Sequence, residues 1–254
     1  MYDYYLGGIH NFPADQEAAK AVIERAPLIR ASVRANRAFL RRAVRYLTSV
    51  GIRQFLDIGS GIPTEGNVHE IAQDAIPDAR VVYVDIDPEA VSESLELLEG
   101  NQWATAIRAD ARDPRSILDH PQTRKLLDFD QPVAVLLVAV LHFVENTDEA
   151  REIVATFRDA LAPGSYLVLA HSTVDELVFD PAMLKRTLDI YRRQTATPLT
   201  TRTRGEVLSL FEGFELVEPG LTWQTLWRPD PDDVDEFKDN PHDSSIYGGV
   251  GRLA

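Results

Sequence analysis

Short apolar segments alternate with stretches of helical periodicity from residue 51 onward, and this alternation constrains the fold more than any other feature. Five segments have the length and composition of buried strands: 54–58, 80–84, 104–108, 133–138 and 166–170. Helical patterns lie between or after them, at 68–75, 89–99, 148–161, 181–194 and 204–211. Strands that alternate with helices form a parallel sheet covered on both faces. We therefore predict a doubly wound α/β fold with a mostly parallel, seven-stranded sheet, whose last two strands are 214–217 and 224–227.

These patterns divide the chain into three parts. Residues 1–50 are predicted to form an N-terminal helical extension, in which Asp15 and Ser32 cap two helices. Residues 51–230 are predicted to form the α/β core. The tail, 231–254, is rich in Asp, Pro and Gly, so we expect loop or partly disordered structure packed on or near the core.

Composition and charge exclude several classes of function. The 254 residues are 44% hydrophobic, enough for a substantial core, yet no apolar run reaches the roughly 18 residues of a membrane span. A formal net charge of −14 argues against broad binding to nucleic acid. The chain has no cysteine, and no His/Asp cluster has the spacing of metal ligands, so we expect a cytoplasmic protein without a metal. The oligomeric state stays open.

A glycine loop directly follows the first strand. It reads Asp57-Ile58-Gly59-Ser60-Gly61, and a carboxylate, Asp85, ends the second strand 24 residues after Gly61. Glycines at the carboxyl end of such a strand let a ligand approach the backbone, and an acid at the end of the next strand can accept hydrogen bonds from ribose hydroxyls. The alternatives are a tight turn without a ligand and a helix cap. Together the two signals favour a nucleoside-containing cofactor.

The residues after the glycine loop indicate which cofactor this is. A dinucleotide fingerprint places a third small residue three positions after the second glycine, but that position is Thr64 and it follows Pro63. A proline withholds an amide where a phosphate needs one. S-adenosylmethionine has no phosphate, and its sulfonium and amino groups favour nearby carboxylates such as Asp57. The loop therefore suits S-adenosylmethionine better than NAD.

Two further strand ends carry polar residues. Asp110 and Ala111 follow the third strand, where the carboxylate can accept from an adenine amino group and the amide of residue 111 can donate to a ring nitrogen. A plain turn or helix cap is the alternative. Val138 begins the segment that leaves the fourth strand, and His142 in that segment is a candidate general base or substrate contact. A histidine beside apolar residues can equally be structural.

These landmarks, in this order, resemble the class I S-adenosylmethionine-dependent methyltransferases, and 161–169 resembles the Pro-Gly turn that leads into their fifth strand. Within that class the chain resembles the actinobacterial S-adenosyl methyltransferase family, long listed as a domain of unknown function. The segments that carry this resemblance are 2–8, 11–15, 36–44, 55–64, 133–144 and 247–251. The resemblance implies a Rossmann-like fold and S-adenosylmethionine as cofactor, with S-adenosylhomocysteine as product. It supplies no agreed acceptor.

By position in that family, each landmark would contact one part of the cofactor. Gly59, Ser60 and Gly61 would contact the methionine part, Asp85 the ribose and Asp110 the adenine. Ile86 stands where a polar residue is expected after Asp85, which leaves the second ribose contact open. We include the flanking Ile86, Ala111 and Val138 among the predicted cofactor-binding residues.

The N-terminal extension supplies the remaining predicted contacts. Its first 12 residues contain Gly7, Gly8, Asn11 and Phe12, and we expect this segment to cover the cofactor as a lid. Packing against the edge of the sheet is the alternative. Arginines recur on one helical face, which is typical of a solvated surface. The alternative is that Arg34 or Arg37 clamps the cofactor carboxylate or an anionic substrate, and we include Arg37 among the predicted cofactor-binding residues.

Three functions remain open on the sequence. The first is methyl transfer to a small molecule, with His142 as the first candidate for a base and Asp15 as the second. The second is a non-catalytic protein that binds the cofactor as a sensor or as a surface for a partner. The third is a nucleotide-dependent oxidoreductase.

Overall fold

The computed structural model describes residues 2–8, 13–62, 66–175, 199–231, 233–234 and 236–254. The helices of the N-terminal part and the first half of the core are α1 (Tyr2–Leu6), α2 (Pro13–Arg25), α3 (Ile29–Ser49), α4 (Val68–Ala75), α5 (Pro88–Leu97), α6 (Pro114–Leu118) and α7 (Pro121–Leu126). The remaining helices include the 3₁₀ turns and are η1 (Leu141–Phe143), α8 (Thr147–Asp159), α10 (Arg204–Ser209), η2 (Gln224–Leu226) and η3 (Pro241–Ser244). The strands are β1 (Gln54–Ile58), β2 (Arg80–Asp85), β3 (Ala104–Arg108), β4 (Ala134–Val138), β5 (Tyr166–Ser172), β6 (Phe214–Leu216), β7 (Thr222–Trp223) and β8 (Ile246–Leu253).

The sheet has the order β3-β2-β1-β4-β5-β8-β6, and β7 pairs with β8 outside this path. Strands β1 to β5 are parallel to one another, whereas β8 runs antiparallel to β5, β6 and β7. The chain order reverses between β1 and β4, so this is the switch point at which open α/β sheets bind ligands. The predicted Rossmann-like, mostly parallel fold is confirmed.

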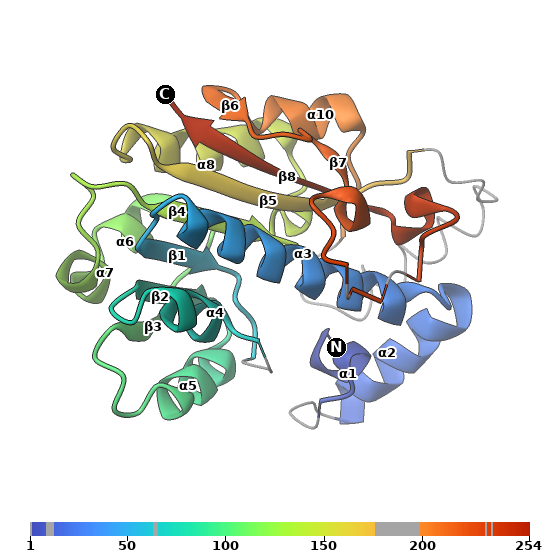
Figure 1. Ribbon diagram of the computed structural model, residues 1–254. Coiled ribbons are helices and arrows are strands. Elements are labelled where there is room, and N and C mark those ends of the chain that lie inside the picture. Colours follow the sequence, from blue (N-terminus) through green and yellow to red (C-terminus); the bar gives the residue numbers. More distant parts are fainter. Residues whose placement is uncertain (1, 9–12, 63–65, 176–198, 232, 235) are drawn as a thin grey trace.

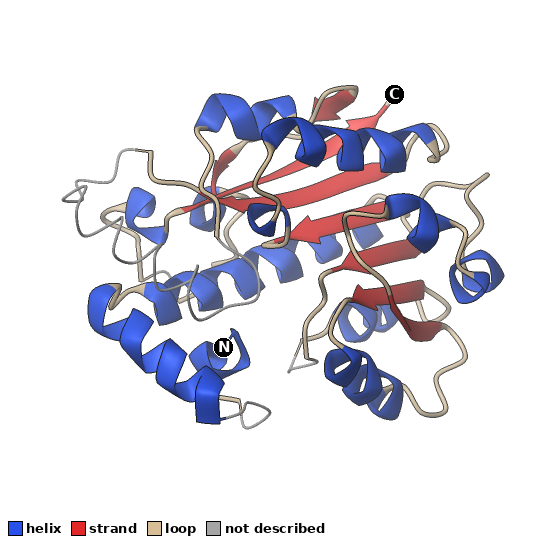
Figure 2. Ribbon diagram, turned by 180° about the vertical axis from the view of Figure 1, so that it is seen from behind, coloured by secondary structure: helices blue, strands red, loops and turns tan. Residues whose placement is uncertain are grey.

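Helices cover both faces of the sheet, because alternate residues of each strand point to opposite sides (Figures 1 and 2). In β1, Phe55 packs with α3 and α4 on one face, while Leu56 and Ile58 pack on the other. That second face is covered by α6, α8 and α10. Strands buried on both faces read as continuous apolar runs, which is why the first five could be located from the sequence.

The long helix α3 crosses one face of the sheet and joins the N-terminal extension to the core (Figure 1). It begins at Ile29, so the prediction that Ser32 caps it is wrong. Ser32 lies inside the helix, is buried, and donates its hydroxyl to the carbonyl of Ser244 at 2.5 Å. Likewise α2 begins at Pro13, which places Asp15 in its first turn rather than at the cap.

The predictions for the end of the chain need two corrections. The expected loop in the tail contains β8, which lies between β5 and β6 and raises the number of strands to eight. The expected strand at 224–227 is instead the short β7 followed by the turn η2. Glycines in β8 allow close packing: a Cβ on Gly248 would lie 2.9 Å from Phe39 Cε2. The glycine-rich composition that predicts a loop here instead allows side chains to pack closely against a strand of the sheet.

An arginine of α3 ties the tail to the core. Arg42 is buried, forms an ion pair with Asp233, and donates to the carbonyls of Trp227 and Gln224 at 2.9 and 2.7 Å. It does not belong to the exposed arginine stripe that the sequence suggested. Among the described residues, no helix is both long and apolar enough to cross a membrane. The helix expected at 181–194 lies outside the described residues.

Candidate functional site

The segments that leave β1 and β4 meet at the switch point in a tight contact between the backbone of Gly59 and the side chain of Val140. Gly59, directly after β1, has a φ of +69°, which favours glycine. A Cβ built on Gly59 would lie 2.6 Å from Val140 Cγ2 and 2.8 Å from Val140 Cβ. Next to Val140, Ala139 has a φ of +60°, an uncommon value for a residue with a side chain. Strained backbone of this kind concentrates at functional sites.

Backbone hydrogen bonds attach the glycine loop to the end of β2. The amides of Gly59 and Ser60 both donate to the carbonyl of Val84, at 2.8 and 3.2 Å. One step further, the amide of Gly61 donates to Asp85 Oδ2 at 2.7 Å. The structure therefore brings the first two predicted motifs into direct contact.

Asp85 is held in a position from which it can accept further hydrogen bonds. Its Oδ1 accepts from the amide of Asp87 at 2.9 Å, so each carboxylate oxygen has one backbone donor. A carboxylate offers about four acceptor sites, so both oxygens keep capacity for one more donor. Partial burial raises the pKa of Asp85, and the two amides oppose that rise. The side chain of Ile86 beside it is 53% exposed and adds no polar contact.

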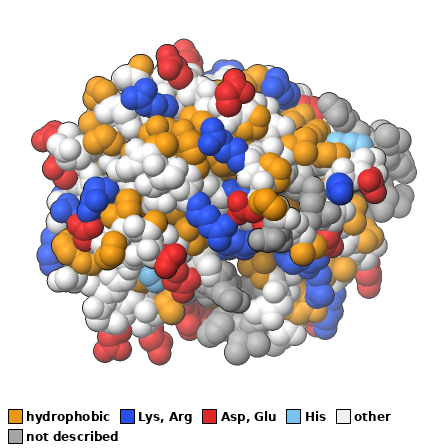
Figure 3. Space-filling model, in the orientation of Figure 1, with side chains coloured by type: hydrophobic (Ala, Val, Ile, Leu, Met, Phe, Trp, Pro, Cys, Tyr) orange, Lys and Arg blue, Asp and Glu red, His pale blue; other side chains and the backbone are white. Residues whose placement is uncertain are grey.

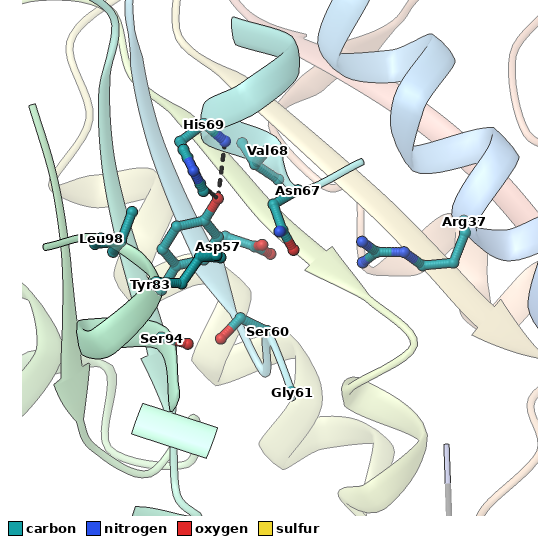
Figure 4. Close-up of a pocket in the computed structure, with 11 residues that line it drawn as sticks. Arg37, Asp57, Ser60, Gly61, Asn67, Val68, His69, Tyr83, Ser94 and Leu98 are labelled. Carbon is teal, nitrogen blue, oxygen red and sulfur yellow. Dashed lines mark hydrogen bonds between the residues drawn. The ribbon is translucent and has the colours of Figure 1, made fainter. Parts of the chain in front are cut away.

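A pocket opens beside the glycine loop, between α3, α4, α5 and the ends of β1 and β2 (Figure 4). It encloses about 290 Å³, part of which is open solvent. Its polar lining combines predicted and unpredicted residues: Arg37, Asp57, Ser60, Gly61, Asn67, His69, Tyr83 and Ser94. The remaining lining side chains are apolar, from Val68 at the start of α4 and from Leu97 and Leu98 at the end of α5.

Asp57 is the buried carboxylate of this pocket. It lies in β1, one residue before the strand ends, and its side chain is largely inaccessible to solvent. Burial raises its pKa from 3.8 to about 7; Arg37 opposes this rise and Asp85 adds to it. Arg37 reaches toward the pocket from α3, and its Nη2 donates to the carbonyl of Gly66 at 3.3 Å (Figure 4). The predicted Arg37 is thus at the pocket.

Two residues that the sequence analysis missed, His69 and Tyr83, support the pocket wall. The Tyr83 hydroxyl accepts the backbone N–H of His69 at 2.8 Å and lies 2.8 Å from its Nδ1 (Figure 4). Burial lowers the pKa of His69 and raises that of Tyr83, so both are neutral near pH 7. Tyr83 stands two residues before Asp85 on the same face of β2, a period-two signal that could have found it.

The predicted adenine contact, Asp110, is already bound by a neighbour. The guanidinium of Arg112 donates to both of its oxygens, from Nε at 2.9 and 3.0 Å and from Nη2 at 2.6 Å. This hydrogen bonding lowers the pKa of Asp110. Ala111 is half-buried and packs on the α8 face of the core. Asp110 therefore keeps its place after β3, but its acceptor capacity is shared with Arg112.

The structure places His142 in a buried cluster rather than in the pocket around Asp57. Its Nδ1 lies 3.2 Å from Ser172 Oγ, and its ring meets that of His171 edge to face at 5.8 Å. Burial lowers the pKa of His142 well below 6.5, with His171 and Arg202 contributing. His142 is therefore neutral near pH 7. Val138, the last residue of β4, is half-buried and packs toward α3.

Arg202 holds this histidine cluster together. Its Nη1 lies 2.7 Å from His171 Nε2, and it donates to the carbonyls of Leu141 and Val144 at 3.0 and 2.7 Å. Because arginine can only donate, Nε2 of His171 must be the acceptor and Nδ1 carries the proton, which it donates to the carbonyl of Ser172 at 2.7 Å. Burial lowers the pKa of His171 to about 4. Arg202 carries no local sequence signal, because its hydrogen-bond partners are distant along the chain.

Among the predicted residues of the N-terminal extension, Arg37 lines the pocket, whereas Gly7 and Gly8 do not. Gly7 has a φ of +84° and ends α1, and Gly8 is half-buried. Helix α1 packs on α2 and α3 through Tyr5, rather than on an edge of the sheet. Asn11 and Phe12 lie outside the described residues, as do Pro63 and Thr64. Arg34 forms an exposed ion pair with Glu236 at 2.6 Å and does not line the pocket.

Comparisons with known proteins agree on the family. The family described as S-adenosyl methyltransferase matches residues 1–254. A crystal structure from Thermobifida fusca YX, of a protein inferred to be a methyltransferase, is 42% identical with a TM-score of 0.91, covering 99% of this chain and 92% of that one. A DUF574 family protein from Streptomyces avermitilis MA-4680 is 41% identical with a TM-score of 0.92, covering 100% and 95%.

A solved structure of much lower sequence identity shares the fold of this chain. A SAM-dependent methyltransferase from Methanosarcina mazei is 17% identical with a TM-score of 0.52, covering 79% of this chain and 92% of that one, and shares the fold alone. A search of curated proteins gave no match. The match over the whole chain and the two structures above 40% identity establish that the chain belongs to the S-adenosyl methyltransferase family.

Proposed function

We propose that this protein binds S-adenosylmethionine at the switch point of its sheet and transfers the methyl group to a small-molecule acceptor. The observation that carries the proposal is the contact between the glycine loop and Asp85. The amide of Gly61 fixes one carboxylate oxygen, and both oxygens keep room for one more donor. Two adjacent ribose hydroxyls are donors of the matching number and spacing.

The residues around Asp85 fit the remaining parts of the cofactor. Gly59 and Gly61 present backbone without side chains, and beyond its chain neighbours no atom of the described residues lies within 4 Å of a Cβ built on Gly61. That space admits a ligand against the loop. Asp57 and Arg37 offer opposite charges on two sides of the pocket, which suits the ammonium and carboxylate groups of a methionine end. Asp110 can receive an adenine amino group if the side chain of Arg112, which donates to both of its oxygens, moves aside.

The chain's contribution to the reaction is positioning. When bound, S-adenosylmethionine supplies a methyl group on a sulfonium, which reacts by in-line displacement. Holding two reactants in line can contribute several kcal/mol to lowering the barrier. An acceptor that bears a proton also needs a base, and His142 is our candidate because its burial keeps the ring neutral. A base at that place would act on an acceptor that reaches the end of β4.

Calorimetric titration with S-adenosylmethionine and with S-adenosylhomocysteine tests the cofactor. We expect binding by the unaltered protein and a loss of about 10- to 100-fold in Asp85→Asn, because a hydrogen bond to a charged group contributes about 1.5–3 kcal/mol. Asp87→Asn is the matched control. It removes a charge two residues away, yet asparagine can still cap α5 as Asp87 does. Binding of NAD in place of both ligands would instead support an oxidoreductase.

Turnover separates an enzyme from a sensor. Release of S-adenosylhomocysteine is measured with a panel of hydroxyl- and amine-bearing small molecules. Product formation that depends on one acceptor would support methyl transfer. Tight binding of both ligands, with no product from any acceptor, would favour a cofactor-binding protein without catalysis.

A further inference from the structure

The charges around Asp57 do not balance. Asp57 on β1 is repelled by the carboxylate of Asp85 on the neighbouring strand β2 and attracted by the guanidinium of Arg37 on α3, so one cation stands against two carboxylates in this group. Asp85 receives two backbone amides, whereas the described residues donate no hydrogen bond to Asp57. A buried carboxylate without a hydrogen-bond donor is costly when charged. Asp57 is therefore the member of this group that binds a proton.

The other titratable groups at this wall do not compete for that proton. His69 on α4 and Tyr83 on β2 hydrogen-bond to each other, and both are neutral near pH 7. Glu70, next to His69, acts electrostatically on these two residues. Near neutral pH the carboxylates are the groups that can change.

We propose that Asp57 exchanges its proton for the cationic end of the ligand: it holds a proton in the ligand-free protein and releases it when an ammonium or sulfonium group enters the pocket. This inference rests on the proposed function, because the ligand is the one assigned there. A cation beside Asp57 supplies the positive charge that the two carboxylates lack. Binding is then linked to proton release, and affinity becomes sensitive to pH.

The size of the effect follows from the pKa of Asp57. With a value of about 7, the side chain is about half protonated at pH 7, about 90% protonated at pH 6 and about 10% at pH 8. If the ligand lowers this pKa well below 6, binding releases about half a proton at pH 7. Affinity then falls about tenfold between pH 8 and pH 6, because only the charged form binds well.

Calorimetry in pairs of buffers with different ionisation heats measures the released protons. S-adenosylhomocysteine, which carries the ammonium group, is titrated at pH 6, 7 and 8 into the unaltered protein, Asp57→Asn and Asp87→Asn. We expect a release that falls as the pH rises in the unaltered protein and in Asp87→Asn. In Asp57→Asn we expect none, together with an affinity that is nearly independent of pH.

A ligand without the cation provides the second comparison. 5′-Methylthioadenosine shares the adenosine and the sulfur but lacks the ammonium group, so its binding, followed by competition with S-adenosylhomocysteine, should not depend on pH between 6 and 8. The inference is overturned if S-adenosylhomocysteine binds without proton release, or if Asp57→Asn releases as many protons as the unaltered protein. Absence of any binding by the folded, unaltered protein would refute the proposed function itself, which is a different result.

Discussion

Alanine at Gly59 tests how tightly the ends of β1 and β4 must pack. The new methyl group would lie 2.6 and 2.8 Å from two atoms of Val140, closer than carbon atoms can approach. The φ of +69° adds strain for any residue with a side chain. Gly61 is the matched control, because its φ is +68° and a Cβ there meets no atom within 4 Å in the part of the chain that the structure describes, its chain neighbours aside.

The two substitutions separate strain from crowding. Left-handed backbone costs alanine about 1–2 kcal/mol, and this cost applies equally to both positions. The loss of glycine freedom in the unfolded chain also affects both equally, so it cancels in the comparison. Crowding in a packed region adds about 1–3 kcal/mol at Gly59 alone. We therefore expect Gly59→Ala to be less stable than Gly61→Ala by about 1–3 kcal/mol.

Thermal unfolding of the ligand-free protein, followed by circular dichroism, measures this difference. For a chain of this length, 1 kcal/mol corresponds to roughly 2–4 °C, so the two midpoints should differ by roughly 2–12 °C. Adding Val140→Gly to each variant removes both crowded atoms. In that background the two alanines should cost the same within about 0.5 kcal/mol. Equal midpoints without the Val140 change, or an excess that persists with it, would refute the reasoning.

Three other predictions concern charged and titratable residues away from that contact. Arg42→Met should lower the free energy of unfolding in urea by about 3–5 kcal/mol, because it leaves Asp233 and two buried carbonyls without their donor. Arg45→Met, at an exposed ion pair, is the control and should lower it by less than about 1 kcal/mol. Similar losses in the two variants would disprove the anchoring role of Arg42. Asp57 has its pKa raised from 3.8 to about 7, so the stability that it contributes falls as pH rises from about 4 to about 7. Relative to the unaltered protein, Asp57→Asn should therefore gain about 2.5 kcal/mol between pH 5 and pH 8, and a gain independent of pH would contradict this. Burial lowers the pKa of His171 to about 4, so the stability that this residue contributes is lost as pH falls from about 6.5 to about 4. Over that interval the free energy of unfolding should fall by up to about 3 kcal/mol less in His171→Gln than in the unaltered protein. Identical acid unfolding of the two proteins would contradict this prediction.

The predicted strands and the glycine loop could be located because their signals are local. The first strand, 54–58, and the helix 68–75 match β1 and α4 residue for residue. At the start of α4, Asn67 and Glu70 form a capping box, in which the amide of Asn67 donates to Glu70 Oε2 at 2.7 Å. Apolar length, helix capping and a glycine after a strand depend on neighbours within a few residues.

The errors occurred where a residue's partner lies far along the chain. Ser32 has a favourable cap composition, yet its partner is Ser244, 212 residues away. The tail is polar and glycine-rich, yet its strand β8 pairs with β5, whose edge would otherwise be open.

The short helices α6 and α7 were also not predicted, although Pro114 and Pro121 mark their first turns.

The amino-acid sequence by itself determined the order of strands and helices, the glycine loop and the carboxylate at the end of β2, because each depends on local conformation and on apolar spacing. The tertiary structure alone decided how those pieces act together. It placed Arg37 and Asp85 around Asp57, paired His69 with Tyr83, and enclosed His142 beside His171 and Arg202. The physical reason is that burial and the arrangement of neighbouring charges determine protonation and hydrogen bonding, and both arise only when distant segments pack together.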